Sequence, residues 1–430
     1  MRSGERPVTP EPRPGGSRIL ILDFDLYGQV GGGQTVYRRI IEQRPRDAWF
    51  YFRRDEPADA PRPANAFGIP FITPLVAMPR KVPERLHDYL WIWHQARNMA
   101  LSVSEALGRI DFDVADAPDY AQLGPFIRPA LAIERCRVGT VAVAMHGTLS
   151  DAFRGGWTPA DDPAYFAALE AREELQFRAA DARYAISDSY AEAWQARAPL
   201  PVNRLDPLVV AGLPDPRPAP PGHAPPDLAF VGRREKWKGP DLFIDLAWCL
   251  PADAYGRLLL LGPEGPGRRG DLSAPLLMDA ARRRGLAERL DMRGSMAAAD
   301  LRRLFAGRSL LLLPSRHDSF NLTALEAIGQ GCPALVSSRA GVARWLRERL
   351  PALDWAVLDI DCGRSAAGAT AAVLRDYDRH RDALLGVLRA AALQVDLASL
   401  GGIHARAEVI DELAQEEAIE IGRASCRERV

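Results

Sequence analysis

Short apolar runs alternate with amphipathic stretches along the whole 430-residue chain. Each run has the length of a buried strand, and the stretches between them have the apolar spacing of helices with one buried face. Strands that alternate with helices form parallel sheets covered by helices on both faces, so the pattern predicts an α/β protein. The expected strands are Arg18–Asp23, Val114–Ala117, Val138–His146, Ala182–Ile186, Leu228–Val231, Arg257–Gly262, Ser309–Leu313 and Ala334–Ser337.

A proline-rich segment divides these runs into two sets. Residues 213–226 contain seven prolines in fourteen positions, a density that excludes a helix or a central strand and is typical of a linker. We therefore predict two doubly wound, Rossmann-like domains, residues 18–212 and 227–400, that face each other across a central cleft. A C-terminal helical segment is expected at residues 401–419.

The two ends of the chain differ from the rest. Residues 1–17 are rich in Pro, Gly and Arg without an apolar core, which predicts a disordered lead-in and not a secretory signal. Residues 420–430, EIGRASCRERV, break the preceding helical pattern and can be back-translated as read-through of a sequencing-library adapter. We interpret them as a non-native tail and leave them out of the fold prediction.

Composition excludes several classes of protein. A formal net charge of −1 and a pI near 6.7 do not favour a nucleic-acid partner. The five cysteines lack the paired spacing of a zinc site or a disulfide framework. No apolar stretch is long enough to span a membrane, so we expect a cytoplasmic protein. Trp91 and Trp93 lie in a long helical pattern near basic residues, which favours core packing but leaves open peripheral contact with the inner face of the membrane.

The segment from Pro314 to Pro333 carries the clearest chemical signal. A strand at 309–313 and a helix at 322–330 place the loop between them at a strand's carboxyl end, where open α/β sheets bind ligands. The amides of Asn321 to Thr323 would present the positive end of the helix to a phosphate, and Asp318 and Glu326 could accept protons from sugar hydroxyls. The alternative is purely structural: Asp318 as a helix cap, and Thr323 with Glu326 as a capping box.

A basic loop precedes this segment in the chain. Gly232-Arg233 follows the expected strand at 228–231, and Lys238-Gly239 follows shortly after. An arginine fork together with a lysine point charge suits a diphosphate and can neutralise it without a metal. On any surface, however, the same residues could form an ordinary solvated basic loop.

Two weaker signals lie in the first half. Gly31-Gly32-Gly33 follows the first strand and precedes a helix expected from Thr35, so we predict a glycine-rich turn that lets the backbone approach a phosphate or a sugar. The spacing is not that of a dinucleotide-binding fingerprint. His146 ends a buried run, where its neutral imidazole could donate or accept a hydrogen bond. A lone histidine at such a position is more often structural.

The motifs at 228–341 closely resemble the donor site of the retaining GT-B glycosyltransferases of glycosyltransferase family 4, in which two acidic residues with seven between them bracket a Phe-Gly loop. The resemblance extends more loosely over residues 18–400. It implies GT-B architecture, an N-terminal acceptor domain, a C-terminal nucleotide-sugar domain, and transfer from a UDP- or GDP-sugar to a hydroxyl of a glycan, lipid-linked or small glycoside acceptor. Neither a metal ion nor a further cofactor is expected.

The resemblance also assigns roles to individual residues. Arg233, Lys238 and the helix end would stabilise the leaving diphosphate, while Glu326 would hold the ribose and Asp318 the sugar ring. His146 would contact an outer hydroxyl of the sugar. The predicted catalytic residues are Arg233, Lys238, Asp318, Glu326 and His146. The predicted donor-binding residues are Gly32, Gly33, Gly232, Ser319, Phe320, Asn321, Leu322 and Thr323.

Departures from the family pattern keep alternatives open. Asp318 stands where the family usually has Glu, Asn321 where it usually has Gly, and Gly341-Val342-Ala343-Arg344 where it commonly has Gly-Gly and an acidic residue. A GT-B UDP-sugar epimerase and a non-catalytic sugar-nucleotide-binding subunit therefore remain alternatives. A metal-dependent GT-A transferase is suggested only by two D-x-D tripeptides, at 23–25 and 111–113.

Overall fold

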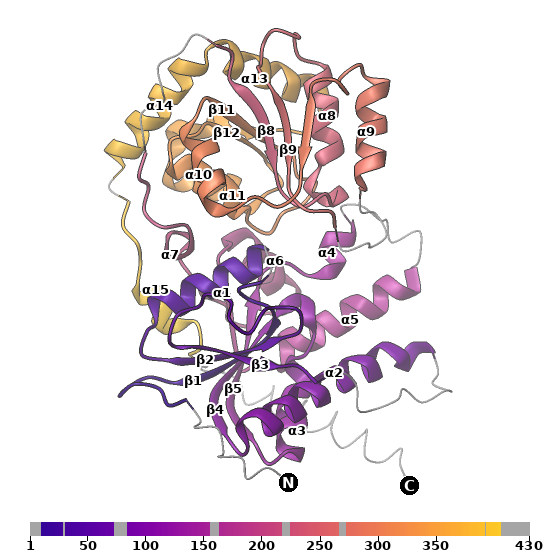
Figure 1. Ribbon diagram of the computed structural model, residues 1–430, viewed down its shortest axis with the longest axis vertical. Helices are drawn as coiled ribbons and strands as arrows, with labels where there is room; N and C mark the ends of the chain where they lie inside the picture. The colour runs from indigo at the N-terminus through magenta and orange to yellow at the C-terminus, as the bar shows by residue number, and fades with distance from the viewer. Residues whose placement is uncertain are drawn as a thin grey trace.

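The computed structural model describes residues 10–28, 31–72, 84–154, 163–216, 224–265, 272–391 and 393–405. Two α/β halves are stacked one above the other, with the N-terminal half below in the view of Figure 1. Each half has its own parallel sheet and its own buried core. Residues 217–223 of the proline-rich segment and the interpreted tail at 420–430 lie outside the described residues.

The sheet of the first half has the strand order β3-β2-β1-β4-β5-β6-β7, and its described pairs are parallel. Helices α1 and α7 pack on one face, and α2 and α3 on the other. The strands are β1 (Arg18–Phe24), β2 (Ala48–Arg53), β3 (Ala66–Pro70), β4 (Asp111–Pro118), β5 (Arg137–Met145), β6 (Ala182–Ala185) and β7 (Asn203–Arg204). The helices are α1 (Gly32–Gln43), α2 (Glu84–Leu107), α3 (Gly124–Ile133), α4 (Leu149–Arg154), α5 (Pro163–Ala179), α6 (Asp188–Arg197) and α7 (Pro207–Ala211), with the short η1 (Asp119–Ala121).

The sheet of the second half has the order β10-β9-β8-β11-β12-β13, again with parallel pairs. Its strands are β8 (Asp227–Val231), β9 (Leu258–Leu261), β10 (Leu290–Arg293), β11 (Ser309–Leu313), β12 (Ala334–Ser337) and β13 (Val357–Leu358). Its helices are η3 (Lys236–Lys238), α8 (Pro240–Trp248), α9 (Ala274–Arg283), α10 (Ala298–Ala306), α11 (Leu322–Gly329), α12 (Gly341–Arg349), η4 (Pro351–Ala356), α13 (Gly363–Arg375) and α14 (Tyr377–Ala390), whereas the last described helix, α15 (Ala398–Gly402), packs on the first half.

Both sheets have the same doubly wound order. Counted within each half, the first six strands are arranged 3-2-1-4-5-6, and the direction of winding reverses between strands 1 and 4. These switch points are β1/β4 in the first half and β8/β11 in the second, and ligands of such sheets bind outside the carboxyl ends of these strands. The prediction of two Rossmann-like domains is confirmed.

The apolar runs located the central strands but not the edges. Every strand predicted from them is present within a few residues of its expected bounds. The predictions did not include β2, β3, β7, β10 and β13, most of which lie toward the edges of their sheets. In the centre of the second sheet, the leucines of β11 are completely or almost completely buried. Burial of each such leucine stabilises the fold by about 2 kcal/mol. Because a central strand buries nearly every side chain, its residues form an almost continuous apolar run, and such a run can be recognised in the sequence.

Three local predictions need correction. The glycine-rich segment is not a free turn, because α1 already begins at Gly32 and not at Thr35. The lead-in is ordered from residue 13, where the amides of Arg13 and Ser17 bind Arg46 and Asp47. The final segment does not start a new helix at 401: α15 covers Ala398–Gly402, and residues 406–419 lie outside the described residues.

After α14, the chain returns to the first half (Figure 1). Leu400 and Ile403 are buried in the core beside α1, and His404 Nε2 lies 2.7 Å from a carboxylate oxygen of the fully buried Asp116. The segment from 395 to 405 therefore ties the second half to the first.

Trp91 on α2, for which the sequence favoured core packing, leaves 55% of its surface exposed. Among the described helices, none is long and apolar enough to cross a membrane.

Candidate active site

The two motifs of the second half meet at the β8/β11 switch point. Gly232 and Arg233 follow β8 directly, and the loop to Asp318 follows β11. Gly239 has a φ of +79°, and a Cβ there would overlap the backbone carbonyl of Pro314. Only glycine permits this approach, so the Lys-Gly loop packs directly against the acidic loop.

An ion pair joins these loops. Lys238 Nζ lies 2.7 Å from Asp318 Oδ2, and the Asp318 residue is only 5% exposed. Arg316 holds the same loops together, because its guanidinium binds both carboxylate oxygens of Asp241 at 2.7 Å and the carbonyl of Lys236. Residues 80 positions apart thus form a single site. Asp318 is not a helix cap, which corrects the purely structural alternative.

Asn321 is the cap of α11. Its backbone has a φ of +79°, and its side-chain oxygen accepts a hydrogen bond from the amide of Ala324 at 3.2 Å. Thr323 therefore lies within the first turn and does not cap the helix, so the predicted capping box is also wrong. Gly and Asn are the residues that tolerate left-handed backbone best, which explains why Asn321 can stand where the resembled family has Gly. Leu322 and Thr323 contribute amides to the positive end of the helix.

The predicted donor-binding residues are placed differently from one another. Ser319 donates a hydrogen bond to the carbonyl of His146, which links the acidic loop to the first half. The side chain of Phe320 lies in the hydrophobic core, so only its backbone can face a ligand. The carbonyl of Gly232 approaches Gly262 so closely that a Cβ at Gly262 would overlap it. The structure brings Ser319 and the α11 end together, but it turns the ring of Phe320 away.

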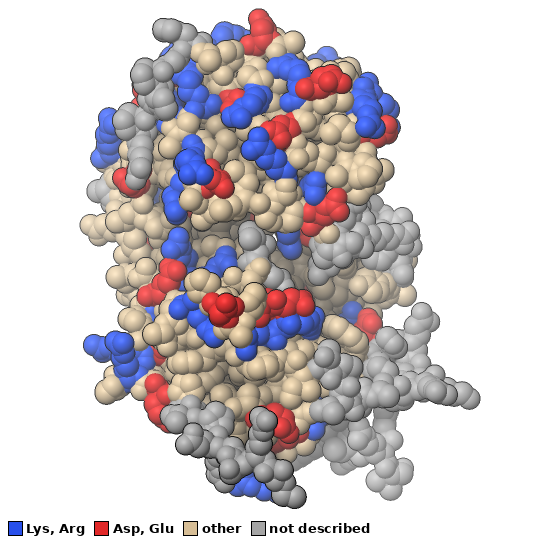
Figure 2. Space-filling model, in the orientation of Figure 1, with Lys and Arg blue, Asp and Glu red and all other residues tan. Residues whose placement is uncertain are grey.

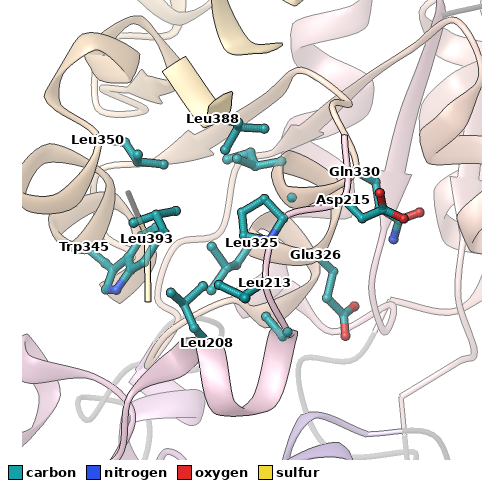
Figure 3. Close-up of a pocket in the computed structure, with 15 residues that line it drawn as sticks. Leu208, Leu213, Asp215, Leu325, Glu326, Gln330, Trp345, Leu350, Leu388 and Leu393 are labelled. Carbon is teal, nitrogen blue, oxygen red and sulfur yellow. The ribbon is translucent and has the colours of Figure 1, made fainter. Parts of the chain in front are cut away.

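Glu326 lies on α11 facing the first half. Burial raises the pKa of its carboxyl, while Arg39 and Arg38 on α1 lower it. Figure 3 shows its carboxylate directed away from the leucines that line the adjoining pocket. That pocket has a volume of about 60 Å³, too small for a sugar nucleotide, and it lies where the linker packs against α11. Arginines of one half and a carboxylate of the other thus approach each other between the two sheets.

Arg233 is the most exposed of the predicted catalytic residues. Its side chain is 41% exposed, and its Nε lies 3.2 Å from a carboxylate oxygen of the buried Glu235. The charge of Arg233 also reaches the first half. Burial raises the pKa of Tyr120 well above its usual range, and the positive charge of Arg233 acts to lower it. Figure 2 shows the surface hollowed between the two halves, with Lys and Arg side chains beside the hollow.

His146 lies on the opposite side, directly after β5. Its amide and that of Gly147 donate to the carboxylate of Asp119, at 3.1 Å and 2.9 Å. Burial lowers the pKa of the His146 imidazole to about 4, so the ring is neutral at pH 7. Among the described residues its buried Nε2 has no hydrogen-bond partner, so its hydrogen-bonding capacity is unused in this structure.

The predicted glycines of the first half are only partly beside His146. A Cβ at Gly33 would lie 3.3 Å from the His146 ring and 3.0 Å from the Tyr120 hydroxyl, so Gly33 is in the same cluster. At Gly32 a Cβ would meet no described atom within 4 Å, so the backbone there faces open space. A side chain is therefore crowded at Gly33 but not at Gly32.

The D-x-D tripeptides have structural partners. Asp25 Oδ1 accepts hydrogen bonds from the amides of Arg54, Asp55 and Glu56, and Asp113 accepts one from the amide of Arg18. These contacts fix a loop and the start of a strand. Within the described residues, no cluster of three or more His, Cys, Asp or Glu side chains could hold a metal ion.

Several polar residues near the site were not predicted. Asp23, Gln34 and Tyr120 form a hydrogen-bonded group, and Asp119 holds the turn at His146. Arg316 joins the two loops of the second half. The only signal that could have found them was position, since Asp23 and Asp119 lie at the carboxyl ends of β1 and β4.

Sequence comparisons relate part of this chain to known glycosyltransferases. The family model described as "Family 4 Glycosyltransferase in conflict systems" matches residues 184–399. The D-inositol 3-phosphate glycosyltransferase of Mycobacterium avium is 33% identical over 165 residues, which are 38% of this chain and 34% of that protein. The corresponding protein of Thermobispora bispora is 29% identical over 168 residues, 38% and 39% of the two chains. The matched region thus spans little more than a third of these relatives.

Solved structures match over nearly the whole chain. Sucrose-phosphate synthase from Thermosynechococcus elongatus has a TM-score of 0.63 at 15% identity and covers 96% of this chain and 98% of its own. The Anabaena protein HepE, in complex with UDP and glucose, has a TM-score of 0.59 at 15% identity, covering 95% and 100%. At these identities the matches show the fold, and they confirm the predicted GT-B architecture.

Proposed function

The chain belongs to the family-4 glycosyltransferases of conflict systems, and we propose that it transfers a sugar from a nucleoside diphosphate sugar to a hydroxyl acceptor in glycan or polysaccharide biosynthesis. The observation that supports this most strongly is the Lys238–Asp318 pair at the N-terminal end of α11. It places a cation, a carboxylate and free helix amides at one switch point. A sugar diphosphate requires all three.

The ion pair also suggests how the donor binds. A diphosphate is a better partner for Lys238 than a single carboxylate, and Arg233 and the α11 amides would share its charge. When Lys238 turns to the diphosphate, Asp318 becomes free to accept hydrogen bonds from the sugar hydroxyls. Glu326 would accept those of the ribose. One exchange of partners would therefore couple binding of the diphosphate to binding of the sugar.

We further propose that the reaction retains the anomeric configuration and needs no metal or other cofactor. Arg233, Lys238 and the helix end supply the positive charge that a metal provides elsewhere. Each residue assigned to the donor already has a role in binding it, so none is assigned as the nucleophile of a covalent intermediate. The acceptor hydroxyl would therefore attack the sugar from the same face as the leaving phosphate. The leaving phosphate would accept the proton of that hydroxyl. UDP and GDP are the expected nucleotides. The matched relatives are named as transferases, which favours transfer over epimerisation.

The test uses the purified protein in EDTA with UDP-, GDP- and ADP-sugars, followed by thermal shift and nucleotide release. One nucleotide should stabilise the protein, and the sugar donor that contains this nucleotide should release it slowly in the absence of metal. Lys238→Ala should lower turnover by about 100-fold or more. Lys236→Ala is the matched control, because this neighbouring lysine contributes only its backbone carbonyl to Arg316.

The outcomes separate the competing functions. Nucleotide binding without release in any condition would support a non-catalytic subunit. Activity that disappears in EDTA would contradict the metal-independent mechanism, and conversion of a UDP-sugar without an acceptor would indicate an epimerase. If no nucleotide stabilises the protein, the site assignment itself is wrong.

A further inference from the structure

The switch point of the first half carries a polar group that the donor site does not use. Asp23 lies near the carboxyl end of β1, and Tyr120 lies in the short η1 that follows β4. Gln34 extends from the first turn of α1. The three residues therefore come from the elements that border the position where a doubly wound sheet binds its ligand.

Hydrogen bonds fix the orientation of this group. Asp23 Oδ2 accepts from the Tyr120 hydroxyl at 2.7 Å and from Gln34 Nε2 at 3.0 Å. Its other oxygen accepts from the amide of Phe24 at 2.8 Å. Asp23 is only 7% exposed, so it orients the other two side chains more than it meets solvent.

The group faces the predicted sugar site. The Tyr120 hydroxyl lies 3.0 Å from the position of a Cβ at Gly33, and its ring centroid is 6.3 Å from that of His146. Tyr120 is also within electrostatic reach of Arg233 on the other half. An acceptor molecule held against Tyr120 would therefore lie between His146 and the charge that stabilises the leaving group.

The polarity of the group determines which molecule it can hold. The Tyr120 hydroxyl donates its hydrogen to Asp23 Oδ2, so toward a ligand the tyrosine oxygen offers lone pairs. Lone pairs bind the proton of a hydroxyl. A phosphate monoester at neutral pH is mostly dianionic, so it offers few protons and would also be repelled by the negative charge of Asp23.

We propose that Asp23, Gln34 and Tyr120 form the acceptor subsite and select a neutral, polyhydroxylated acceptor over a phosphorylated one. This proposal rests on the proposed glycosyl transfer. The family match at residues 184–399 does not include these three residues, so it assigns them no role. Burial raises the pKa of Asp23 to about 6, and its carboxyl remains mostly ionised at pH 7.5.

The test compares neutral molecules with their phosphorylated counterparts in the presence of UDP. Methyl glucoside, myo-inositol and glycerol are paired with glucose 6-phosphate, inositol 3-phosphate and glycerol 3-phosphate. Binding is measured by calorimetry, and transfer is measured with the donor found for the wild-type protein. We expect a neutral molecule to bind at least tenfold more tightly than its phosphorylated counterpart.

Variants then assign the selectivity to the group. Tyr120→Phe should raise the acceptor KM about tenfold, while UDP affinity, measured by calorimetry, should change by less than about twofold. Asp23→Asn should reduce the discrimination against the phosphorylated molecule. Tyr184→Phe is the matched control, because this buried tyrosine also donates to a carboxylate, that of Asp116, at 2.9 Å. Its acceptor KM should equal that of the wild-type protein.

Two kinds of failure can be told apart. If no nucleotide binds, the proposed function fails and the subsite fails with it. If UDP or GDP binds but the phosphorylated molecules are preferred, or no neutral molecule binds, only the subsite proposal is overturned. Equal effects of Tyr120→Phe and Tyr184→Phe would overturn it as well.

Discussion

The two switch points have the same strand order but differ in the charged residues that follow their strands. The second half places Arg233 and Lys238 after β8 and pairs Lys238 with Asp318 after β11, whereas the ends of β1 and β4 carry the acidic residues Asp23 and Asp119. The sheets themselves therefore determine where a ligand binds, and the residues that follow the strands determine which ligand it is. We call the β8/β11 switch point the basic point and the β1/β4 switch point the acidic point. This pair suits a reaction between an anionic donor and an acceptor that offers hydroxyl groups.

The two points also differ in how their carboxylates are bound. Asp318 is paired with a single lysine, a partner that an incoming diphosphate can take over. Asp119 instead accepts two backbone amides and the hydroxyl of Tyr190, and no ligand can replace backbone donors. The basic point is thus built to exchange partners, and the acidic point is built to hold a fixed geometry.

The largest expected effect comes from Gly239→Ala at the basic point. A Cβ would overlap the carbonyl of Pro314, and the φ of +79° would be strained as well. Separating the two loops should cost about 3–5 kcal/mol and abolish nucleotide binding. Gly285→Ala is the control, because its φ of +68° is similar but its Cβ would meet no described atom within 4 Å.

Urea unfolding and nucleotide titration measure both variants. The control should lose only about 1 kcal/mol and bind nucleotide normally. Equal losses of stability in the two variants would mean that the contact between the loops contributes nothing beyond backbone strain.

A smaller effect is expected at the acidic point from Asp119→Asn. Asparagine keeps one oxygen to accept from the amides of His146 and Gly147, but its NH2 group would replace the oxygen that accepts from the Tyr190 hydroxyl and from Gly147 at 2.9 Å, and the fold should lose about 3 kcal/mol. Because the His146 turn would shift, turnover should fall while nucleotide affinity is retained. Stability is read from urea unfolding and affinity from calorimetry. A parallel loss of affinity would show that the two points are not separate.

The pH dependence of His146 should be smaller again. Its folded pKa of about 4 lies below the ordinary 6.5, so between these values the unfolded chain binds more protons. Its contribution to stability is therefore present above pH 6.5 and is lost as the pH falls to 4. The loss should be on the order of 2 kcal/mol.

The measurement compares wild-type protein with His146→Gln at pH 7 and pH 4.5. Asp23 and Asp119 have pKa values raised to about 6, so their contributions run in the opposite sense, falling as the pH rises from 3.8 to 6. Both proteins contain Asp23 and Asp119, so the contributions of these carboxyls largely cancel in the difference, whereas the charge of Asp116 acts only on the wild-type imidazole, where it raises the pKa of His146 against the effect of burial. A stability difference that does not change with pH would contradict the assignment of a buried neutral imidazole.

The contrast between the switch points also explains what could be predicted from the sequence. The basic point was found because its residues follow short apolar runs and keep an order that resembles that of a known family. The acidic group was missed because Asp23 has partners 11 and 97 positions away, and in isolation it looked like part of a turn or a metal motif. The two-residue strands β7 and β13 bury too few side chains to leave a pattern.

The smallest effect is expected for Asn321→Gly, and it would sharpen the comparison. Glycine loses the hydrogen bond to the amide of Ala324 but relieves the left-handed backbone, so the two changes should cancel to within about 0.5 kcal/mol. Asn321→Ala loses the cap and keeps the strain, and should cost about 2 kcal/mol. Nucleotide affinity should be unchanged in the glycine variant, because the helix end keeps its amides. If affinity falls in the glycine variant while its stability does not, the side chain of Asn321 contacts the donor, and this departure from the family pattern belongs to donor selection.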